Sequence, residues 1–405
     1  MTRNLSPFRA IGAVLPLALL AACSLVGGPW AGHKPAPAPV VAAPPPPPAL
    51  PAPQETSRFE LADGQSVIGA LQETTVGKDD TLTDIARRFN LGYEELLRAN
   101  PCVDPWLPGA GRTSVLPTRF VLPDAPHDGV VINIAAMRLF YFPPHKASEP
   151  QVVFTHPIGI GKVGWATPEG TTKIVRRQKD PTWHPPISVI KEHKENGDVL
   201  AAVVGPGPDN PLGNRAFYLT WPGYLIHGTN KPAGVGLRSS HGCIRLFPED
   251  ISELFDKVPI GTEVHVVNQP YVFGWDNGQL VMQAFGSLED DRRDWKKAQQ
   301  ALMSRSLNKN MQKELKSRGQ TVDWDLVTQL AHDPRGLIVP VTLTDASLDK
   351  VLASATKVEN QLPEGASWDG KSDLPVDEQT FNQIMGDSDP QDHAVQAPGV
   401  HKSGG

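Results

Sequence analysis

The sequence predicts a mainly β domain accompanied by a small βααβ domain and an α-rich C-terminal extension. Short apolar runs separated by turn residues recur through residues 127–268, which is typical of strands. Apolar residues at helical spacing between positions 82 and 89 predict an amphipathic helix in a compact unit before that region. After Pro270 the chain changes to longer helical patterns.

The composition describes a soluble globular protein. The chain has 405 residues, of which 40% are hydrophobic and 20% charged, and this length accommodates two or three domains. The net charge of −6 includes no basic patch, which argues against nucleic acid as a partner. Residues 369–405 contribute −5 of that charge, and we expect them to form an acidic disordered tail.

The N-terminus predicts export. Two arginines precede the apolar stretch 10–22, which is too short for an ordinary membrane span but suits a signal peptide. The residues Leu-Ala-Ala before Cys23 resemble a bacterial lipobox, which implies a signal peptide over 1–23 and acylation of Cys23. By the same resemblance Ser24 is an outer-membrane address in a Gram-negative periplasm. An ordinary signal peptide cut nearby is the alternative.

Residues 24–65 are expected to form a proline-rich linker. Ten of the nineteen residues 35–53 are proline, a composition that favours an extended polyproline II spacer of about 3.1 Å per residue. A ligand for a proline-reading domain is the competing interpretation.

Residues 66–123, hereafter the βααβ module, contain two predicted helices. One covers 82–89 and can be capped by Asp80 or Thr81, and the other covers 91–100. The flanking apolar runs can pair as strands. The Asp80-Thr81-Leu82 start and the second helix resemble the LysM domain, which implies binding to N-acetylglucosamine-containing glycans such as peptidoglycan. A generic two-helix subdomain is the alternative.

Residues 127–268, hereafter the β-rich domain, hold most of the expected strands. A hairpin is expected around residues 135–137, and long loops after residue 183 are candidates for the wall of a substrate groove. The strands are expected at 130–134, 138–142, 152–155, 173–177, 216–220 and 263–267, with one helix at 249–258.

The reactive residue types gather between residues 224 and 246. His227, His241 and Cys243 lie within seventeen residues. A thiol becomes a nucleophile when an imidazole accepts its proton, and the imidazole needs an acceptor to orient it. The amides around Gly242 and Cys243 are candidate oxyanion donors, and Arg245 suits a substrate carboxylate.

Other interpretations of these residues stay open. His227, His241 and Cys243 are soft ligands that could bind zinc, although the sequence offers no fourth ligand at a typical spacing. All three can instead be structural. Cys102 is interpreted as a free bystander, while a disulfide from Cys102 to Cys243 is possible in an oxidising compartment.

The pattern from His227 to Arg245, together with residues 166–171, resembles the YkuD-type L,D-transpeptidases over residues 129–268. The resemblance implies a YkuD-like β-sandwich or barrel without metal or cofactor. It implies these roles: Cys243 as nucleophile, His227 as proton acceptor and donor, the Gly228 carbonyl as its orienting group, His241 and Arg245 as pocket residues, and Ser240 as support for the loop that contains Gly242.

The same resemblance implies the reaction. Such enzymes attack the carbonyl of the L-centre of diaminopimelate in a peptidoglycan stem and release D-alanine. The acyl group then passes to another stem or to a lysine of a Braun-type outer-membrane lipoprotein, whereas transfer to water would make the protein an L,D-carboxypeptidase. The competing class is a non-catalytic, LysM-containing lipoprotein that only binds the cell wall.

Residues 269–368, hereafter the C-terminal extension, carry no recognisable motif. Helices are expected at 294–303, 322–331 and 347–355. Trp295, Trp324 and Leu326 are the expected core anchors. A packing or regulatory subdomain is the default interpretation.

Overall fold

A computed structural model describes residues 50–54, 56–197, 199–293, 303, 305–342 and 345–362. The predicted signal peptide, Cys23, most of the predicted linker and the acidic tail lie outside these residues. Within the described part of the chain, no helix is both long and apolar enough to cross a membrane.

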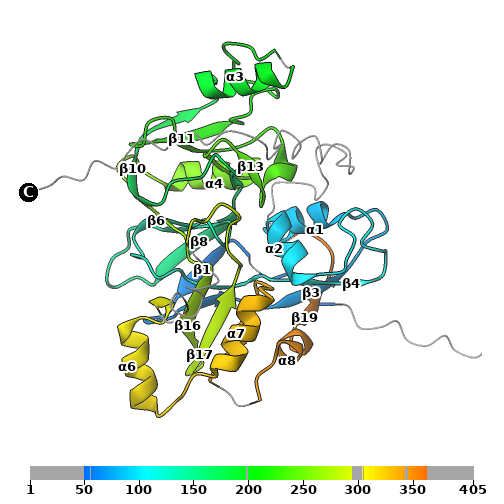
Figure 1. The fold of residues 1–405 in the computed structure, drawn as a ribbon, viewed down its shortest axis with the longest axis vertical. Helices are drawn as coiled ribbons and strands as arrows, with labels where there is room; N and C mark the ends of the chain where they lie inside the picture. The colour runs from blue at the N-terminus through cyan, green and yellow to red at the C-terminus, as the bar shows by residue number, and fades with distance from the viewer. Residues whose placement is uncertain are drawn as a thin grey trace, which may run out of the picture. The chain divides into compact units, whose positions relative to one another are not determined.

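The β-rich domain is built on a nine-stranded mixed sheet (Figure 1), which confirms the mainly β fold class. Its β6–β15 and β12–β14 pairs are parallel and the others antiparallel. In spatial order the strands are β1 (Arg58–Leu61), β8 (Gln151–Pro157), β7 (Arg138–Phe142), β6 (Gly129–Asn133), β15 (Glu263–Val267), β10 (Gly170–Lys179), β11 (Arg215–Leu219), β12 (Leu225–His227) and β14 (Ile244–Arg245).

Strand β1 corrects the sequence-based assignment of the linker. Arg58–Leu61 falls inside the segment predicted to be a spacer, yet it pairs antiparallel with β8 at the edge of the sheet. Leu61 is buried in this position and Phe59 packs against the same core, so apolar contacts and the backbone ladder together hold a strand inside the segment predicted to be a spacer.

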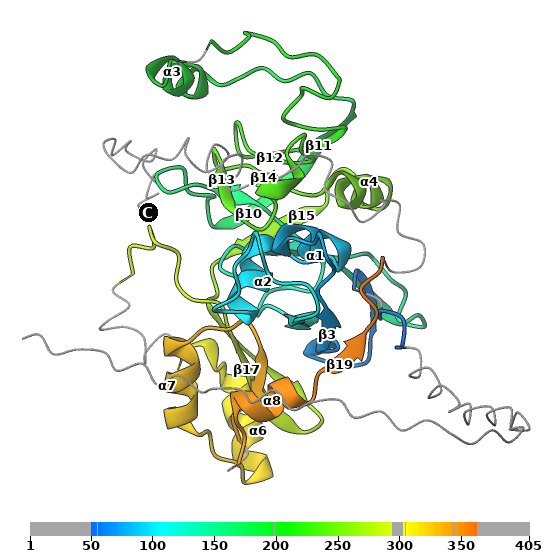
Figure 2. The same cartoon turned by 90° about the vertical axis from the view of Figure 1, so that its right-hand side faces the viewer.

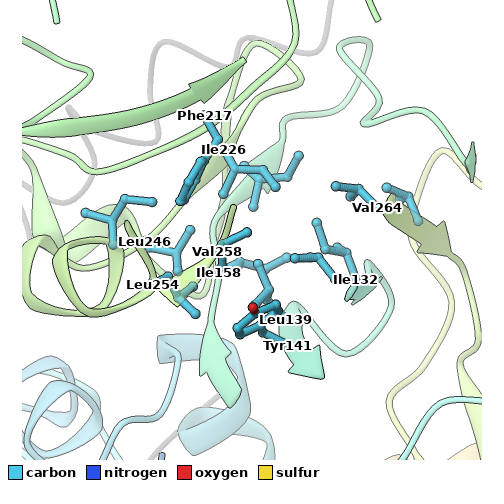
Figure 3. Packing of buried hydrophobic residues seen from close by; sticks show 14 of the residues in the cluster. Ile132, Leu139, Tyr141, Ile158, Phe217, Ile226, Leu246, Leu254, Val258 and Val264 are labelled. Carbon is cyan, nitrogen blue, oxygen red and sulfur yellow. The ribbon is translucent and has the colours of Figure 1, made fainter. Parts of the chain in front are cut away.

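Apolar side chains from β11, β12 and the helix α4 (Pro248–Lys257) form the main core of the β-rich domain. Figure 3 shows Phe217 and Ile226 above Leu254 and Val258, with Leu139 and Tyr141 contributed from β7. Four smaller elements complete the domain: β9 (Ile160–Gly161) paired with β13 (Arg238–Ser240), the helix α3 (Ile187–Glu195) and a 3-10 turn at Pro232–Gly234.

The βααβ module has the predicted order, with each expected strand divided in two. Thr81 caps the first helix in a capping box with Asp84. Gly69 has a φ of +74°, and a Cβ there would lie 2.1 Å from the Thr118 carbonyl oxygen, so the strand bends at this position. The elements are β2 (Val67–Gly69), β3 (Gln72–Thr75), α1 (Leu82–Arg88), α2 (Tyr93–Ala99), β4 (Thr113–Leu116) and β5 (Arg119–Val121).

A buried ion pair joins the βααβ module to the sheet. Arg138 on β7 donates to both oxygens of Glu95 on α2, at 2.7 and 2.8 Å, and the two side chains are 1% and 6% exposed. Arg138 also donates to the Asn90 carbonyl and lies over the Phe120 ring. These contacts satisfy the guanidinium in an environment where an unpaired charge would be costly.

Two of the three helices expected in the C-terminal extension are present, as α7 and α8, while the one expected at 294–303 lies outside the described residues except for residue 303. The helix α6 and the sheet of β16, β17 and β18 were not predicted. Leu326 is buried as predicted, but Trp324 is 37% exposed and is not a core anchor, because it occupies the first, outward-facing position of α7. Trp295 lies outside the described residues. The elements are β16 (Tyr271–Asp276), β17 (Gln279–Ala284), α6 (Lys309–Arg318), α7 (Trp324–His332), β18 (Ile338–Pro340), α8 (Leu348–Ala353) and β19 (Thr356–Val358).

The last strand of the extension completes the sheet of the βααβ module. β19 pairs parallel with β3 (Figure 2). Two residues after β19, the side chain of Asn360 lies among polar groups of the βααβ module. Its amide nitrogen donates to the Thr75 carbonyl at 2.9 Å and to Asp80 at 2.6 Å, while Arg88 donates to its oxygen at 2.5 Å. The edge of β3 is therefore covered by the chain's own C-terminal segment.

We expect Glu95→Gln to lower the free energy of unfolding by about 3 kcal/mol, since it leaves the Arg138 charge buried without a counter-charge. Thermal and urea unfolding of the purified protein measure the change. Glu60→Gln is the matched control, because Glu60 pairs with Arg58 at a site where both side chains are about half exposed. Its effect should stay below about 0.5 kcal/mol, and equal effects of the two variants would contradict the prediction.

Candidate active site

The parallel pairing of β12 with β14 brings two distant parts of the candidate site together. Ile226 lies opposite Ile244, and His227 lies opposite Arg245. Both isoleucines are buried in the core, so by alternation His227 and Arg245 extend from the other face of the sheet. Cys243 immediately precedes β14, two residues before Arg245, and continues that face.

His227 is buried and oriented by its neighbour. Its Nδ1 lies 2.6 Å from the Gly228 carbonyl oxygen, which can only accept, so Nδ1 carries a proton. Burial and, to a smaller extent, the Arg245 charge lower the pKa of His227 to about 3. Hydrogen bonds to the carbonyls of Gly228 and Leu212 raise this pKa but do not outweigh the burial. The imidazole is therefore neutral, and its Nε2 keeps a lone pair that can accept a proton.

Cys243 is partly buried and is a thiol at neutral pH. Its Sγ donates to the Gly223 carbonyl oxygen at 3.6 Å. Burial raises the pKa of the Cys243 thiol, although the Leu225 backbone amide and the Arg245 charge act in the opposite direction. The charge of the Arg245 guanidinium acts to lower the pKa of both His227 and Cys243.

The loop before the cysteine is held from inside. Ser240 donates to the Cys243 carbonyl at 2.5 Å and accepts from the Gly242 amide at 3.2 Å. Gly242 has a φ of +98°, and a Cβ there would lie 2.8 Å from the Tyr224 ring, so only glycine fits. The Gly242 amide thus donates to Ser240 and is not free to serve as an oxyanion donor. Thr167 also donates to the Gly242 carbonyl.

Arg245 keeps hydrogen-bonding capacity inside the site. Its Nη1 donates to the Ser239 carbonyl at 3.1 Å, while its Nε is buried without a hydrogen-bond partner among the described residues. Burial lowers the pKa of Arg245, but a guanidinium remains charged in proteins.

His241 has partners that the motif did not reveal. Its Nε2 contacts a carboxylate oxygen of Glu192 on α3, and the Trp165 ring packs edge-on at 4.8 Å between centroids. Glu192 also pairs with Lys162. Sequence reasoning missed Glu192 and Lys162, which lie 49 and 79 residues before His241, while the only signal for Thr167 was its place in the recognised 166–171 block.

The disulfide and zinc interpretations of Cys102, Cys243 and the two histidines are not supported by the described residues. Cys102 and Cys243 are both free thiols, so the described chain holds no disulfide between them. Over the same part of the chain, no group of three or more His, Cys, Asp or Glu side chains is arranged to hold a metal ion. His227, His241 and Cys243 thus do not converge as zinc ligands.

The chain matches proteins of one enzyme family. The model of the YkuD L,D-transpeptidase catalytic domain matches residues 127–266, and that of the LysM domain matches residues 74–105. The chain is 44% identical over 211 residues to the probable L,D-transpeptidase YbiS of Escherichia coli (strain K12), covering 51% of this chain and 67% of that protein. It is 32% identical over 194 residues to the putative L,D-transpeptidase YkuD of Bacillus subtilis (strain 168), covering 47% and 96%.

A third relative is matched over a longer stretch of the chain than the other two. The probable L,D-transpeptidase YcfS of Escherichia coli (strain K12) is 41% identical over 248 residues, which cover 60% of this chain and 76% of that protein. With most of that relative's length matched, and with LysM and YkuD domains in one chain, the protein belongs to the L,D-transpeptidases.

Proposed function

We propose that this protein is a periplasmic, cysteine-dependent L,D-transpeptidase in which Cys243 is the nucleophile and His227 the general base. The observation that carries the proposal is the geometry of His227. Its Nδ1 proton is fixed on Gly228, so Nε2 is left as a proton acceptor on the face of the sheet that continues to Cys243.

The first half-reaction is acyl transfer to the enzyme. The Cys243 sulfur attacks the carbonyl carbon of the L-centre of diaminopimelate while the thiol proton moves to His227 Nε2. The tetrahedral intermediate collapses with cleavage of the C–N bond to D-alanine. His227 returns its proton to the leaving amine, and a thioester to Cys243 remains.

The second half-reaction decides the product. An acceptor amine attacks the thioester, its proton passes to His227, and the C–S bond breaks to regenerate the thiol. The amine belongs to the diaminopimelate of another stem or to a lysine of a Braun-type lipoprotein. Attack by water instead of an amine would give an L,D-carboxypeptidase.

The rest of the site and chain fits a cell-wall substrate. The Arg245 Nε without a hydrogen-bond partner among the described residues suits a carboxylate of the stem peptide. The LysM match implies contact with the glycan strand. A lipid anchor at Cys23 and a proline-rich spacer would hold the enzyme at the outer membrane, facing the peptidoglycan. We propose the domain boundaries expected from the sequence, except that the linker ends before β1 (Arg58–Leu61).

We expect Cys243→Ala to abolish covalent reaction with a carbapenem, because no other residue of the site replaces the attacking sulfur. Intact-mass spectrometry should show one adduct on the wild-type protein and none on the variant. Cys102→Ala is the matched control, since Cys102 is an exposed free thiol, and it should react like the wild type. An unmodified wild-type protein would support the non-catalytic alternative.

The same variants identify the acceptor in cells. In a strain that lacks the gene, wild-type protein should restore either 3-3 crosslinked stems or stems linked to a lipoprotein, and Cys243→Ala should restore neither. Restoration of tripeptide stems alone would identify a carboxypeptidase. Muropeptide analysis measures all three products.

The acylation rate should stay nearly constant between pH 5 and pH 8. An ordinary histidine of pKa about 6.5 would lose roughly 30-fold of its neutral form over that interval, whereas a His227 pKa of about 3 keeps the base neutral throughout. Stopped-flow measurement of carbapenem acylation tests this. A fall centred near pH 6.5 would contradict the assigned state of His227.

Cys23→Ala should move the protein from the membrane fraction to the soluble periplasmic fraction, because a diacylated or triacylated cysteine anchors far more strongly than a single chain. Immunoblots of fractionated cells measure the distribution. Ser24→Asp is the companion variant and should retain the protein at the inner membrane. Membrane association of Cys23→Ala equal to that of the wild type would contradict the anchor.

A further inference from the structure

Three ionisable side chains from separate segments meet beside the loop that carries Cys243. Lys162 directly follows β9, Glu192 lies on α3, and His241 directly follows β13. The Lys162 Nζ lies 2.5 Å from one oxygen of Glu192, and the His241 Nε2 contacts the other. One carboxylate therefore holds a cation and an imidazole at the same time.

The buried Lys162 cation and His241 keep the Glu192 carboxylate ionised. The Lys162 side chain is 5% exposed, and its backbone amide donates to the Ser240 carbonyl at 2.8 Å, so the cation cannot move away from the loop. Burial alone would raise the pKa of Glu192, but the hydrogen bonds from Lys162 and His241 outweigh it and leave that pKa below its usual value. Glu192 is therefore ionised and can only accept hydrogen bonds.

An acceptor at Nε2 fixes the state of the His241 ring. The proton must lie on Nε2, and burial lowers the pKa of His241 despite the Glu192 charge, so the ring is neutral and its Nδ1 carries a lone pair. The Trp165 ring packs edge-on against the imidazole and limits its rotation. This tautomer is the opposite of that of His227, whose proton lies on Nδ1.

Helix α3 has little apolar packing. Val189 is its one buried residue, all nine residues of the helix being described, and Ile187 at its start is 85% exposed. Apolar packing thus contributes little to holding α3, which increases the relative importance of the two contacts made by Glu192.

We propose that Glu192 is a positioning residue of the L,D-transpeptidase site. It holds His241, two residues before the nucleophile, in the Nε2–H tautomer. It also holds α3 against the residues that directly follow the paired strands β9 and β13. The inference rests on the proposed role of Cys243 but assigns a residue that the family motif does not contain.

Glu192→Gln tests the proposal. Lys162 and His241 contact different oxygens of Glu192, and in a carboxamide one of these oxygens is replaced by an NH₂ donor, so the two contacts cannot both be kept. The first-order rate constant of carbapenem acylation should fall roughly tenfold, with a smaller change in the concentration that gives half the maximal rate. Long-range ¹H–¹⁵N spectra of histidine-labelled protein should show the Nε2–H tautomer of His241 in the wild type and a mixture in the variant. His241→Gln assigns the signal.

Glu195→Gln is the matched control on the same helix. Glu195 pairs with Lys191 at 3.5 Å where both side chains are at least half exposed, so this variant should acylate at the wild-type rate. If Glu192→Gln does not fold, Lys162→Met/Glu192→Leu removes the buried Lys162 cation together with its counter-charge and should show the same loss of rate and of tautomer.

The outcomes separate this proposal from the proposed function. A wild-type rate and an unchanged His241 signal in a folded Glu192 variant would overturn the role of Glu192. A wild-type protein that forms no adduct would instead count against the role of Cys243, and the tautomer spectrum would still decide whether Glu192 fixes His241.

Discussion

The parallel pairing of β12 with β14 is the constraint on which the site depends. It aligns His227 with Arg245 and buries Ile226 and Ile244 in the same core. A slip of one residue would turn the polar side chains of β14 into that core. The burial of these two isoleucines therefore fixes the positions of His227 and Arg245 on the opposite face of the sheet.

Burial gives the site a neutral resting state. It lowers the pKa of His227 and raises that of the Cys243 thiol, so neither the cation nor the thiolate is stable before substrate arrives. In the proposed mechanism, proton transfer and attack on the carbonyl would therefore occur together. Such a thiol is less open to oxidation than a preformed thiolate, which is an advantage in an oxidising compartment.

Local sequence sufficed for the parts of the fold that local residues determine. The β15 strand, the Thr81 cap and the seventeen residues from His227 to Cys243 depend on periodicity, capping chemistry and a motif, and all can be recognised in a single segment. The role of Glu192 could not be predicted in that way, because its partners are chosen by the packing of α3. Trp324 shows the same limit, since a large apolar side chain at the start of a helix is buried only when a neighbour covers it.

The strand β1 and the extension illustrate how tertiary pairing overrides composition. The sequence of Arg58–Leu61 predicts a spacer, but the segment forms a strand by pairing with the edge of β8. Strands β16 and β17 pair mainly with each other. Strand β1 is too short to show a periodicity that distinguishes it from a loop. In contrast, β16 and β17 flank Asn277-Gly278, both with positive φ, which is a hairpin signal that periodicity alone does not reveal.

The closing of the βααβ module by β19 has a consequence for the order of folding. Thr74 lies opposite Val358 in the parallel pair of β3 and β19, and its hydroxyl donates to the Val358 carbonyl, 284 residues later in the chain. The module that is made early therefore gains its last strand only when nearly the whole chain is present. Until then β3 has an open edge that can pair with another polypeptide. A protein truncated before β19 would thus lose solubility through the βααβ module, although the missing residues lie at the end of the C-terminal extension and far from that module in sequence.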